Sequence, residues 1–285
     1  MTSSVAAVEV NPASSFCQRW SGGQHSWRHT SEGGFDPSRY VVEPIPEASA
    51  KGYVVANHYS GSYPAAKLRF GMFHCDREAQ LVGVLVLGIP TSTRALSGPF
   101  PELEPFVESC ELSRLVLADA VPANGETWFI ARCFSEAAAA GIRGVVSFAD
   151  PVPRVVDGRV LHPGHVGTIY QASNAALCGR STPRTLTLLP DGRVLNDRSK
   201  QKVRQQERGH DHVERDLVRL GAPVMRAGQR PADWLAESLR AIGATQLRHR
   251  GNWRYCFKVG TAAQRRRTLL AMPAGPYPKG VDLAA

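Results

Sequence analysis

Hydrophobic and polar positions follow a regular pattern from residue 39 onward. Residues 39–45 alternate as in a β-strand, and residues 45–59 have the apolar spacing of a helix. Two apolar runs, 68–74 and 81–89, flank a polar turn. They predict an antiparallel hairpin within a buried sheet.

The middle of the chain continues this mixture of strands and helices. Residues 110–117 predict a strand, residues 127–141 a helix, and residues 142–150 another strand. A short strand leading into a helix is expected over 164–177, and a closing hairpin over 184–195. This order predicts an α/β fold with a mixed central sheet and helices on both faces.

The two ends of the chain differ from this block. Residues 1–37 are rich in Ser and Gly without a period, and they predict a flexible N-terminal arm. Residues 38–195 are interpreted as the catalytic domain. Residues 196–285 are predicted to be a mainly helical C-terminal region, with an amphipathic helix at 197–220 and a second helix at 232–243.

Positive charge is concentrated in the last third of the chain. The net charge is +9, but residues 1–189 hold 15 Lys and Arg against 16 Asp and Glu, whereas residues 190–285 hold 19 against 9. Such asymmetry favours a polyanion as partner, and nucleic acid, such as double-stranded DNA, is the leading candidate. A solvated basic surface is the alternative. The predicted DNA contacts are Lys200, Lys202, Arg204, Arg208, Arg248, Arg250, Arg254, Arg265, Arg266 and Arg267.

Aromatic residues are interleaved with these cations near the C-terminus. Trp253, Tyr255 and Phe257 occupy every second position, with Arg254 between the first two and Lys258 directly after Phe257. This composition suits base stacking beside phosphate contacts. The same segment could instead be an edge strand whose aromatic side chains face the core, and both interpretations stay open.

Cysteines, histidines and hydropathy give no further specific motif. The six cysteines form no CxxC pair, which predicts free thiols, and the histidine pairs His25/His29, His162/His165 and His210/His212 are expected in turns or on the surface. No run of eighteen apolar residues and no signal-peptide pattern occur, so we expect a cytoplasmic protein without membrane insertion.

Several segments together are similar to a known family. NHYSGSYP (57–64), ELSRLVL (111–117), GVVSFADP (144–151) and GHVGTIYQASNAALCG (164–179) resemble the Mom family of phage DNA-modification proteins. This family is described as a divergent branch of the GNAT acetyltransferase superfamily. The resemblance, which covers most of residues 39–279, implies a GNAT-like sheet and conversion of DNA adenine to N6-carbamoylmethyladenine as protection against restriction.

The resemblance also implies cofactors and site residues. Acetyl-CoA and iron are associated with the family, and a further small-molecule group donor is needed, because acyl transfer alone gives an amide rather than a carbamoylmethyl group. His58, Tyr59 and Asp150 match candidate iron ligands or active-site groups. Their alternative roles are a helix end and a turn. Ser147 and Tyr170 are further catalytic candidates, with Tyr170 at a position that suits a general acid.

Cofactor binding is expected on two segments that the resemblance aligns with coenzyme A contacts. Ser113 and Arg114 lie on the strand expected beside the pantetheine arm. Asn124, Gly125 and Thr127 lie where a helix N-terminus would bind the pyrophosphate. The segment keeps only one glycine of the usual pyrophosphate-binding pattern.

Three functions are therefore compatible with the sequence. The first is adenine modification in DNA, which requires the base to flip out of the duplex, with Gln171 or Asn174 as candidates to read it. The second is ordinary N-acetyltransfer to a small-molecule or protein amine. The third is DNA binding without catalysis.

Overall fold

The computed structural model describes residues 16–76, 78–156 and 158–278. Within them the chain forms two compact units. The first contains the residues up to 153, then 162–181, and those from 252 on. The second contains 154–161 and 182–251. This division differs from the predicted one, because the chain returns to the first unit after residue 251.

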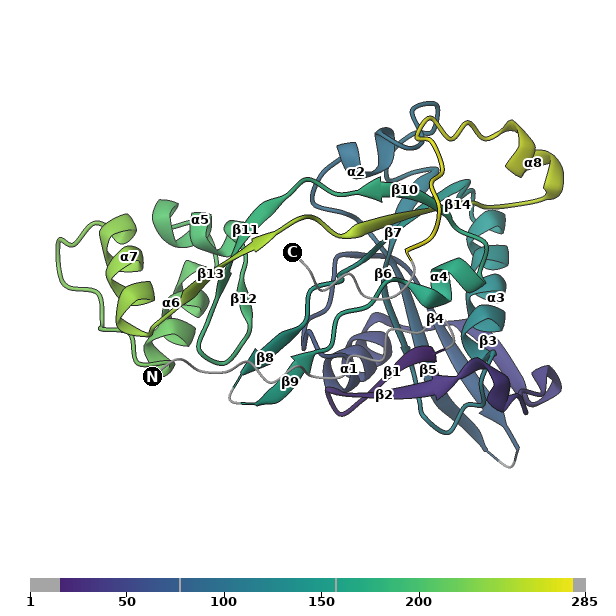
Figure 1. The fold of residues 1–285 in the computed structure, drawn as a ribbon, viewed down its shortest axis with the longest axis horizontal. Coiled ribbons are helices and arrows are strands. Elements are labelled where there is room, and N and C mark those ends of the chain that lie inside the picture. The colour runs from purple at the N-terminus through teal and green to yellow at the C-terminus, as the bar shows by residue number, and fades with distance from the viewer. Residues whose placement is uncertain (1–15, 77, 157, 279–285) are drawn as a thin grey trace. The chain divides into compact units, whose positions relative to one another are not determined.

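A seven-stranded mixed sheet forms the centre of the first unit (Figure 1). Its strands, in spatial order, are β10 (Ala176–Arg180), β14 (Trp253–Lys258), β7 (Gly144–Ala149), β6 (Ser109–Leu117), β5 (Ala79–Gly88), β4 (Ala66–Cys75) and β3 (Tyr40–Pro44). Neighbouring strands are antiparallel except β6 and β7, which are parallel. The predicted mixed α/β sheet is confirmed.

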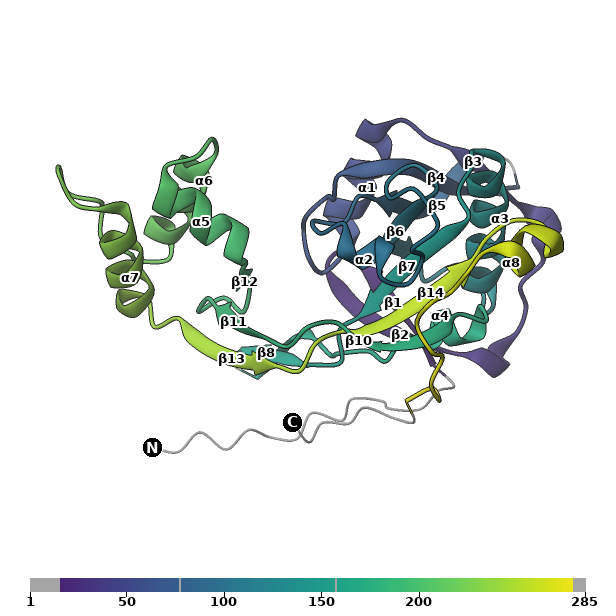
Figure 2. The ribbon, with the colours of Figure 1, turned by 90° about the horizontal axis from the view of Figure 1, so that it is seen from above.

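Helices cover both faces of this sheet, as the sequence predicted. The helices of the unit are α1 (Glu47–Asn57), α2 (Arg94–Ser97), α3 (Gly125–Ala139), α4 (Thr168–Ala172) and α8 (Ala262–Arg267). Alternate residues of β5 point to opposite sides. Val84 and Val86 pack in a cluster with α1, whereas Leu85 and Leu87 pack in the cluster that contains α3. Figure 2 shows α1 and α3 on either side of the strands.

The two parallel strands part before they end. Pairing of β6 with β7 runs from Ser109 opposite Gly144 to Leu112 opposite Ser147. Beyond Leu112, β6 continues beside β5 alone, and β7 continues beside β14 alone. The sheet is therefore split between the second half of β6 and the end of β7.

Part of the predicted flexible arm is an ordered hairpin. β1 (Phe16–Ser21) pairs with β2 (Gln24–His29), and the turn is formed by Gly22 and Gly23, both at positive φ. A Gly-Gly pair is a favoured two-residue hairpin turn. Gly22 and Gly23 were therefore a sequence signal for this hairpin. Residues 1–15 of the predicted arm lie outside the described residues.

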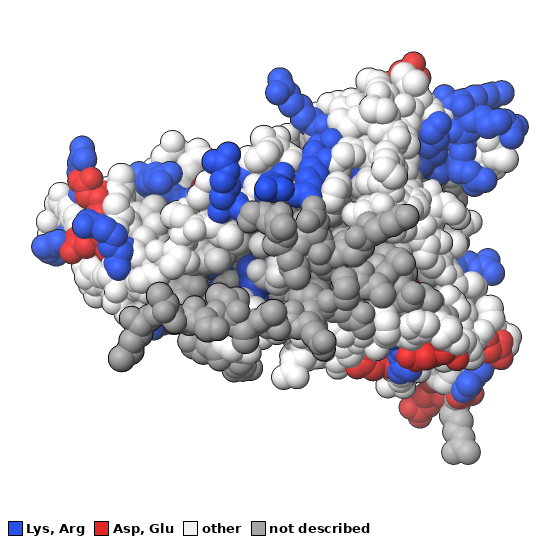
Figure 3. Space-filling model, in the orientation of Figure 1, with Lys and Arg blue, Asp and Glu red and all other residues white. Residues whose placement is uncertain are grey.

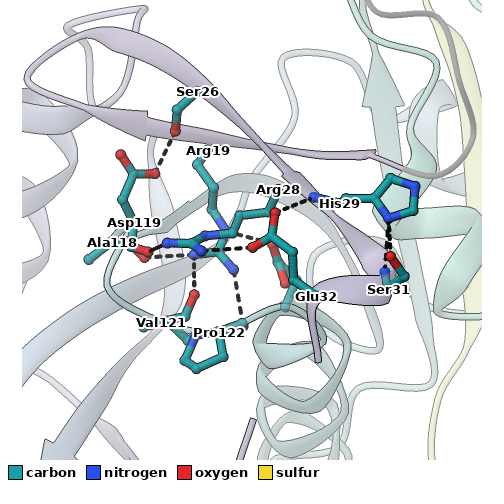
Figure 4. Close-up of polar contacts among 11 residues, drawn as sticks. Arg19, Ser26, Arg28, His29, Ser31, Glu32, Ala118, Asp119, Val121 and Pro122 are labelled. Atoms are coloured by element: carbon teal, nitrogen blue, oxygen red, sulfur yellow. Dashed lines mark hydrogen bonds and ion pairs between the residues drawn. The ribbon is translucent and has the colours of Figure 1, made fainter. Parts of the chain in front are cut away.

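A buried arginine fixes this hairpin to the loop after β6. Arg19, which is 1% exposed, donates from Nη1 to the carbonyl oxygens of Ala118 and Val121 at 2.7 and 2.8 Å. It donates from Nη2 to Pro122 at 3.3 Å and from Nε to Glu126 Oε1 at 2.5 Å. Figure 4 shows the guanidinium among these loop carbonyls. Two further hairpin residues, Ser26 and Arg28, bond to Asp119 in the same loop.

The second unit has a small core of its own. Its main elements are β11 (Arg184–Leu188), β12 (Val194–Leu195), β13 (Thr245–His249), α5 (Asp197–Gln205), α6 (His210–Arg219) and α7 (Pro231–Ala241). A two-stranded hairpin, β8 (Arg154–Val156) and β9 (Arg159–His162), precedes α4 in the chain. Trp234, Leu217 and Val203 fill the space between the helices. The predicted helix 197–220 is two helices, because Gln206 and Gly209 adopt left-handed conformations between them.

The last part of the chain belongs to the central sheet. β14 lies between β7 and β10, and Tyr255 and Phe257 are buried in the main core. These two rings are therefore not available to stack on bases. Ser181 N donates to Asn252 O at 2.8 Å, so the chain leaves and re-enters the sheet at adjacent points.

None of the helices in the described part of the chain has the length and apolar character needed to cross a bilayer.

Replacing Arg19 by Ala is expected to lower the free energy of unfolding by about 3–5 kcal/mol, because the Glu126 carboxylate would stay buried without its partner. Urea denaturation followed by tryptophan fluorescence measures this change. Arg215→Ala is the control, since it removes an exposed ion pair with Asp211 and should have a much smaller effect. A small decrease for Arg19→Ala as well would show that the buried pair does not stabilise the fold.

Candidate active-site cavity

A cavity of about 220 Å³ lies where β6 and β7 part. Its walls come from the β1–β2 hairpin, the loop after α1, β6 from Glu111 onward, the end of β7 and the start of α4. All of these segments belong to the first unit. The split in the sheet thus brings together residues that are far apart in the sequence.

Four of the five predicted catalytic residues line this cavity. They are His58, Tyr59, Asp150 and Tyr170. The fifth, Ser147, is fully buried beside it, and its hydroxyl donates to Leu112 O at 3.0 Å. Burial raises the pKa of Tyr170 to about 12, against a hydrogen bond with Ser147, so Tyr170 keeps its proton at neutral pH.

His58 is held as a neutral imidazole. The backbone N–H of Ser60 donates to His58 Nδ1 at 3.1 Å, so the ring carries its proton on Nε2. Burial, followed by the positive charge of Arg114 and the nearby His162 and His165, lowers the pKa of His58 to about 2. The ring is therefore uncharged at physiological pH.

Aromatic rings form one wall of the cavity around Tyr59. The centroid of the Tyr59 ring lies 4.3 Å from that of His58, 4.6 Å from Trp20 and 4.5 Å from His162. His162 was predicted in a turn or on the surface. It is 1% exposed, so a surface position is wrong for this histidine. His165 lines the cavity.

Asp150 lies both at the predicted turn and at the cavity. Its Oδ1 accepts a hydrogen bond from Val152 N at 3.0 Å, and its carbonyl accepts one from His165 N at 2.8 Å. It therefore stabilises the turn after β7. It also lines the cavity together with His58 and Tyr59, although it comes from a different element.

Arg114 connects β6 to the loop that carries His58 and Tyr59. Its Nε and Nη2 donate to Ser62 O and Ser62 Oγ at 3.3 and 3.1 Å. Arg114 and the adjacent Ser113, the two predicted cofactor contacts on β6, both line the cavity. The observed bonds give Arg114 a positioning role for the loop as well.

Glu111 is a cavity residue that the sequence prediction missed. Its carboxylate lies 3.3 Å from Ser113 Oγ, which donates to Oε1. Burial raises the pKa of Glu111, while the bond from Ser113 and the charge of Arg114 oppose this shift. The signal was a charged residue within an apolar strand, which sequence reasoning recognised only at Arg114.

The other predicted cofactor residues lie elsewhere. Asn124 and Thr127 line a separate groove of about 1430 Å³ beside α3, and the backbone of Gly125 is packed against Val121 and Phe35. Glu126, the second residue of α3, is the one that reaches the cavity of the candidate site. The two predicted cofactor segments therefore do not share one pocket.

The predicted iron site gains no support from the side chains of the described residues. They contain no group of three or more His, Cys, Asp or Glu side chains arranged to hold a metal ion. In the predicted set of His58, Tyr59 and Asp150, His58 Nδ1 already accepts a backbone hydrogen bond and Nε2 carries a proton. This imidazole, as arranged, does not fit a metal ligand.

Neither predicted adenine-reading amide reaches the cavity. Gln171 Nε2 donates to Val166 O and to Tyr255 Oη, both at 3.1 Å, and Asn174 lines the separate groove. Gln18 and Asn252 line the cavity instead. They come from the segments assigned to the arm and the C-terminal region, so no local pattern could have identified them.

The predicted DNA contacts are distributed over both units. Arg204, Arg208, Arg248 and Arg250 are exposed in the second unit, and Lys202 is half-buried. Arg265, Arg266 and Arg267 are exposed on α8 in the first unit, where Figure 3 shows a concentration of positive charge.

Two of the predicted contacts are engaged within the protein. Lys200 Nζ bonds to Asp197 Oδ1 at 2.6 Å and to Thr187 Oγ1 at 3.1 Å. Arg254 lies on β14, and its Nη1 donates to the sulfur of Met272 at 3.1 Å. Their cationic groups are therefore less available to phosphates than those of the exposed arginines.

Comparison with solved structures gives distant similarities. One is a tandem GNAT protein from the clavulanic acid biosynthesis pathway, without AcCoA, with 10% identity and a TM-score of 0.41, covering 78% of this chain and 99% of that one. Another is malonyl-CoA decarboxylase from Rhodopseudomonas palustris, with 12% identity and a TM-score of 0.32, covering 83% of this chain and 60% of that one.

No curated protein matches the chain. The model of the Mom protein family, in contrast, matches residues 39–279. This match spans the central sheet from β3 to β14, all cavity-lining segments after the N-terminal hairpin, and the second unit. The chain therefore belongs to the Mom protein family.

Proposed function

We propose that this chain modifies adenine in DNA at N6, with N6-carbamoylmethyladenine as the product and protection from restriction as its role. The observation that carries the proposal is the single cavity in which Tyr59, Asp150, Glu111 and Tyr170 meet. Membership of the Mom family and the exposed arginines of both units support DNA as the substrate.

The cavity suits one flipped base better than a large ligand. Pockets for drug-sized ligands enclose roughly 300–1,000 Å³, and this one encloses about 220 Å³. Trp20 and Tyr59 supply aromatic surface of the kind on which a flipped base stacks. A base must leave the duplex to reach such a site, because the N6 amine lies within the base pair.

The ionisable groups divide into a base and an acid. We assign Glu111 as the group that accepts a proton from N6 while nitrogen bonds to the donor carbon, because its raised pKa makes it a better base than an ordinary carboxylate. Tyr170 stays protonated and can donate a hydrogen bond to the group that departs from the donor. Arg114 keeps the loop with His58 and Tyr59 in place through Ser62.

Nucleoside mass spectrometry of DNA from cells that express the chain tests the proposal. Wild-type protein should yield the carbamoylmethyl nucleoside, and Tyr170→Phe or Glu111→Gln, which remove the proposed acid or base, should lower its yield by about 100-fold. Tyr53→Phe is the matched control, since Tyr53 lies on α1 and does not line the cavity. Unmodified adenine in the presence of folded wild-type protein would refute adenine modification. Full activity of both site variants would instead refute this cavity as the active site.

The rate of modification should increase with pH through the raised pKa of Glu111, because only the ionised carboxylate accepts a proton. Glu111→Gln should lower the rate by about 100-fold and abolish that increase. His58 should add no step at near-neutral pH, since its pKa is about 2. The initial rate of nucleoside formation in buffered cell extract measures this profile. An unchanged pH dependence in Glu111→Gln would exclude Glu111 as the base.

Neutralising Arg265, Arg266 and Arg267 together should weaken DNA binding and reduce its salt dependence by about 1 in log–log slope for each phosphate that is no longer bound. Fluorescence anisotropy with a duplex at several salt concentrations measures the slope. The matched control replaces Arg215, Arg226 and Arg230, each of which is ion-paired with a neighbouring acid. The same slope in the α8 variant as in wild type would place α8 outside the interface.

A further inference from the structure

The N-terminus of α3 carries an anion supplied by the chain itself. Glu126 is the second residue of this fifteen-residue helix, and its side chain is 2% exposed. The positive end of the helix dipole favours a carboxylate at this position, as it would favour a bound phosphate. The structure shows no side-chain cap hydrogen bond at this helix start, and the Glu126 carboxylate pairs with Arg19, so a negative charge of the chain lies next to the first turn of α3.

Arg19 closes the same place from the other side. All three nitrogens of its guanidinium are bonded, to Glu126 and to the carbonyl oxygens of Ala118, Val121 and Pro122. The loop before α3 thus directs three of its carbonyl groups at a buried cation. Coenzyme A, which the resemblance implied at this position, does not fit the arrangement.

We propose that the group donor of this chain is a small, phosphate-free molecule bound wholly within the cavity between β6 and β7, and that no pyrophosphate binds at the N-terminus of α3. This inference rests on the proposed function, since it assumes that a donor enters the cavity beside the flipped base. It specifies the chemical class of that donor.

Charge supports the proposal. A pyrophosphate at the helix terminus would lie against the Glu126 carboxylate, and like charges at such a distance repel strongly in a buried setting. Moving Glu126 away would leave the guanidinium of Arg19 buried with only neutral carbonyl partners. Both alternatives are unfavourable, because an unpaired buried charge is costly.

Size supports it as well. The cavity encloses about 220 Å³, below the roughly 300–1,000 Å³ of pockets for drug-sized ligands. Among the described residues, the larger groove beside α3 has no lining residue in common with the cavity.

The cavity does provide polar partners for a small donor. Arg114 contributes a positive charge, Glu111 and Asp150 contribute carboxyl groups, and Ser113 contributes a hydroxyl. These groups suit a compact polar metabolite that needs no phosphate as an anchor.

Two measurements test the inference with the full-length wild-type chain. Isothermal titration with coenzyme A and with acetyl-CoA should show no binding at millimolar concentration. In cell extract that supports adenine modification, added desulfo-coenzyme A, an unreactive analogue, should leave the rate unchanged within about twofold. Glycerol-matched buffer serves as the control addition.

A dissociation constant below about 100 μM for either thioester or thiol, which corresponds to more than about 5 kcal/mol of binding free energy, would overturn the inference. Inhibition of about tenfold or more by the analogue would overturn it as well. If untreated extract forms no modified adenine, the proposed function fails, and the titration still decides whether coenzyme A binds.

Discussion

The separation of two parallel strands is the constraint on which the candidate site depends. β6 and β7 share only four residue pairs. Beyond them β6 continues beside β5, and β7 continues beside β14. Backbone groups on the inner edges of the split would be exposed to a gap if nothing filled it. The β1–β2 hairpin, the loop after α1 and the start of α4 meet there, and the cavity is the space that they leave.

Two arginines hold the walls of the cavity in place through an ion pair and hydrogen bonds. Arg19 with Glu126, and Arg114 with the Ser62 loop, fix two of the walls. Burial keeps the His58 imidazole uncharged, and the positive charge of Arg114 adds to this effect; at Glu111 the same charge opposes the effect of burial on the pKa. A single arginine thus influences the protonation of two residues on different elements and also fixes the position of the loop between them.

Local patterns predicted most of the central sheet because each strand has its own signature. The apolar runs of β4 and β5 and the alanine-rich α3 are examples, and family resemblance added His58, Tyr59 and Asp150. The missed features depend on long-range contacts. Glu111 lies within the paired stretch of β6 and acquires its environment only when the distant segments that line the cavity assemble, and β14 joins the sheet only after the insertion of residues 182–251. The composition of β14 resembled a basic surface, although Tyr255 and Phe257 are core residues.

The way the second unit is inserted has a consequence for how members of such a family can diverge. Residues 182–251 leave from the end of β10 and return at the start of β14, where Ser181 and Asn252 are hydrogen-bonded neighbours. A hairpin loop of about two to five residues could join these strands directly. The sheet and its cavity therefore do not depend on the inserted sequence for their connectivity. A change in the length or sequence of this module is therefore compatible with an unchanged strand order around the cavity.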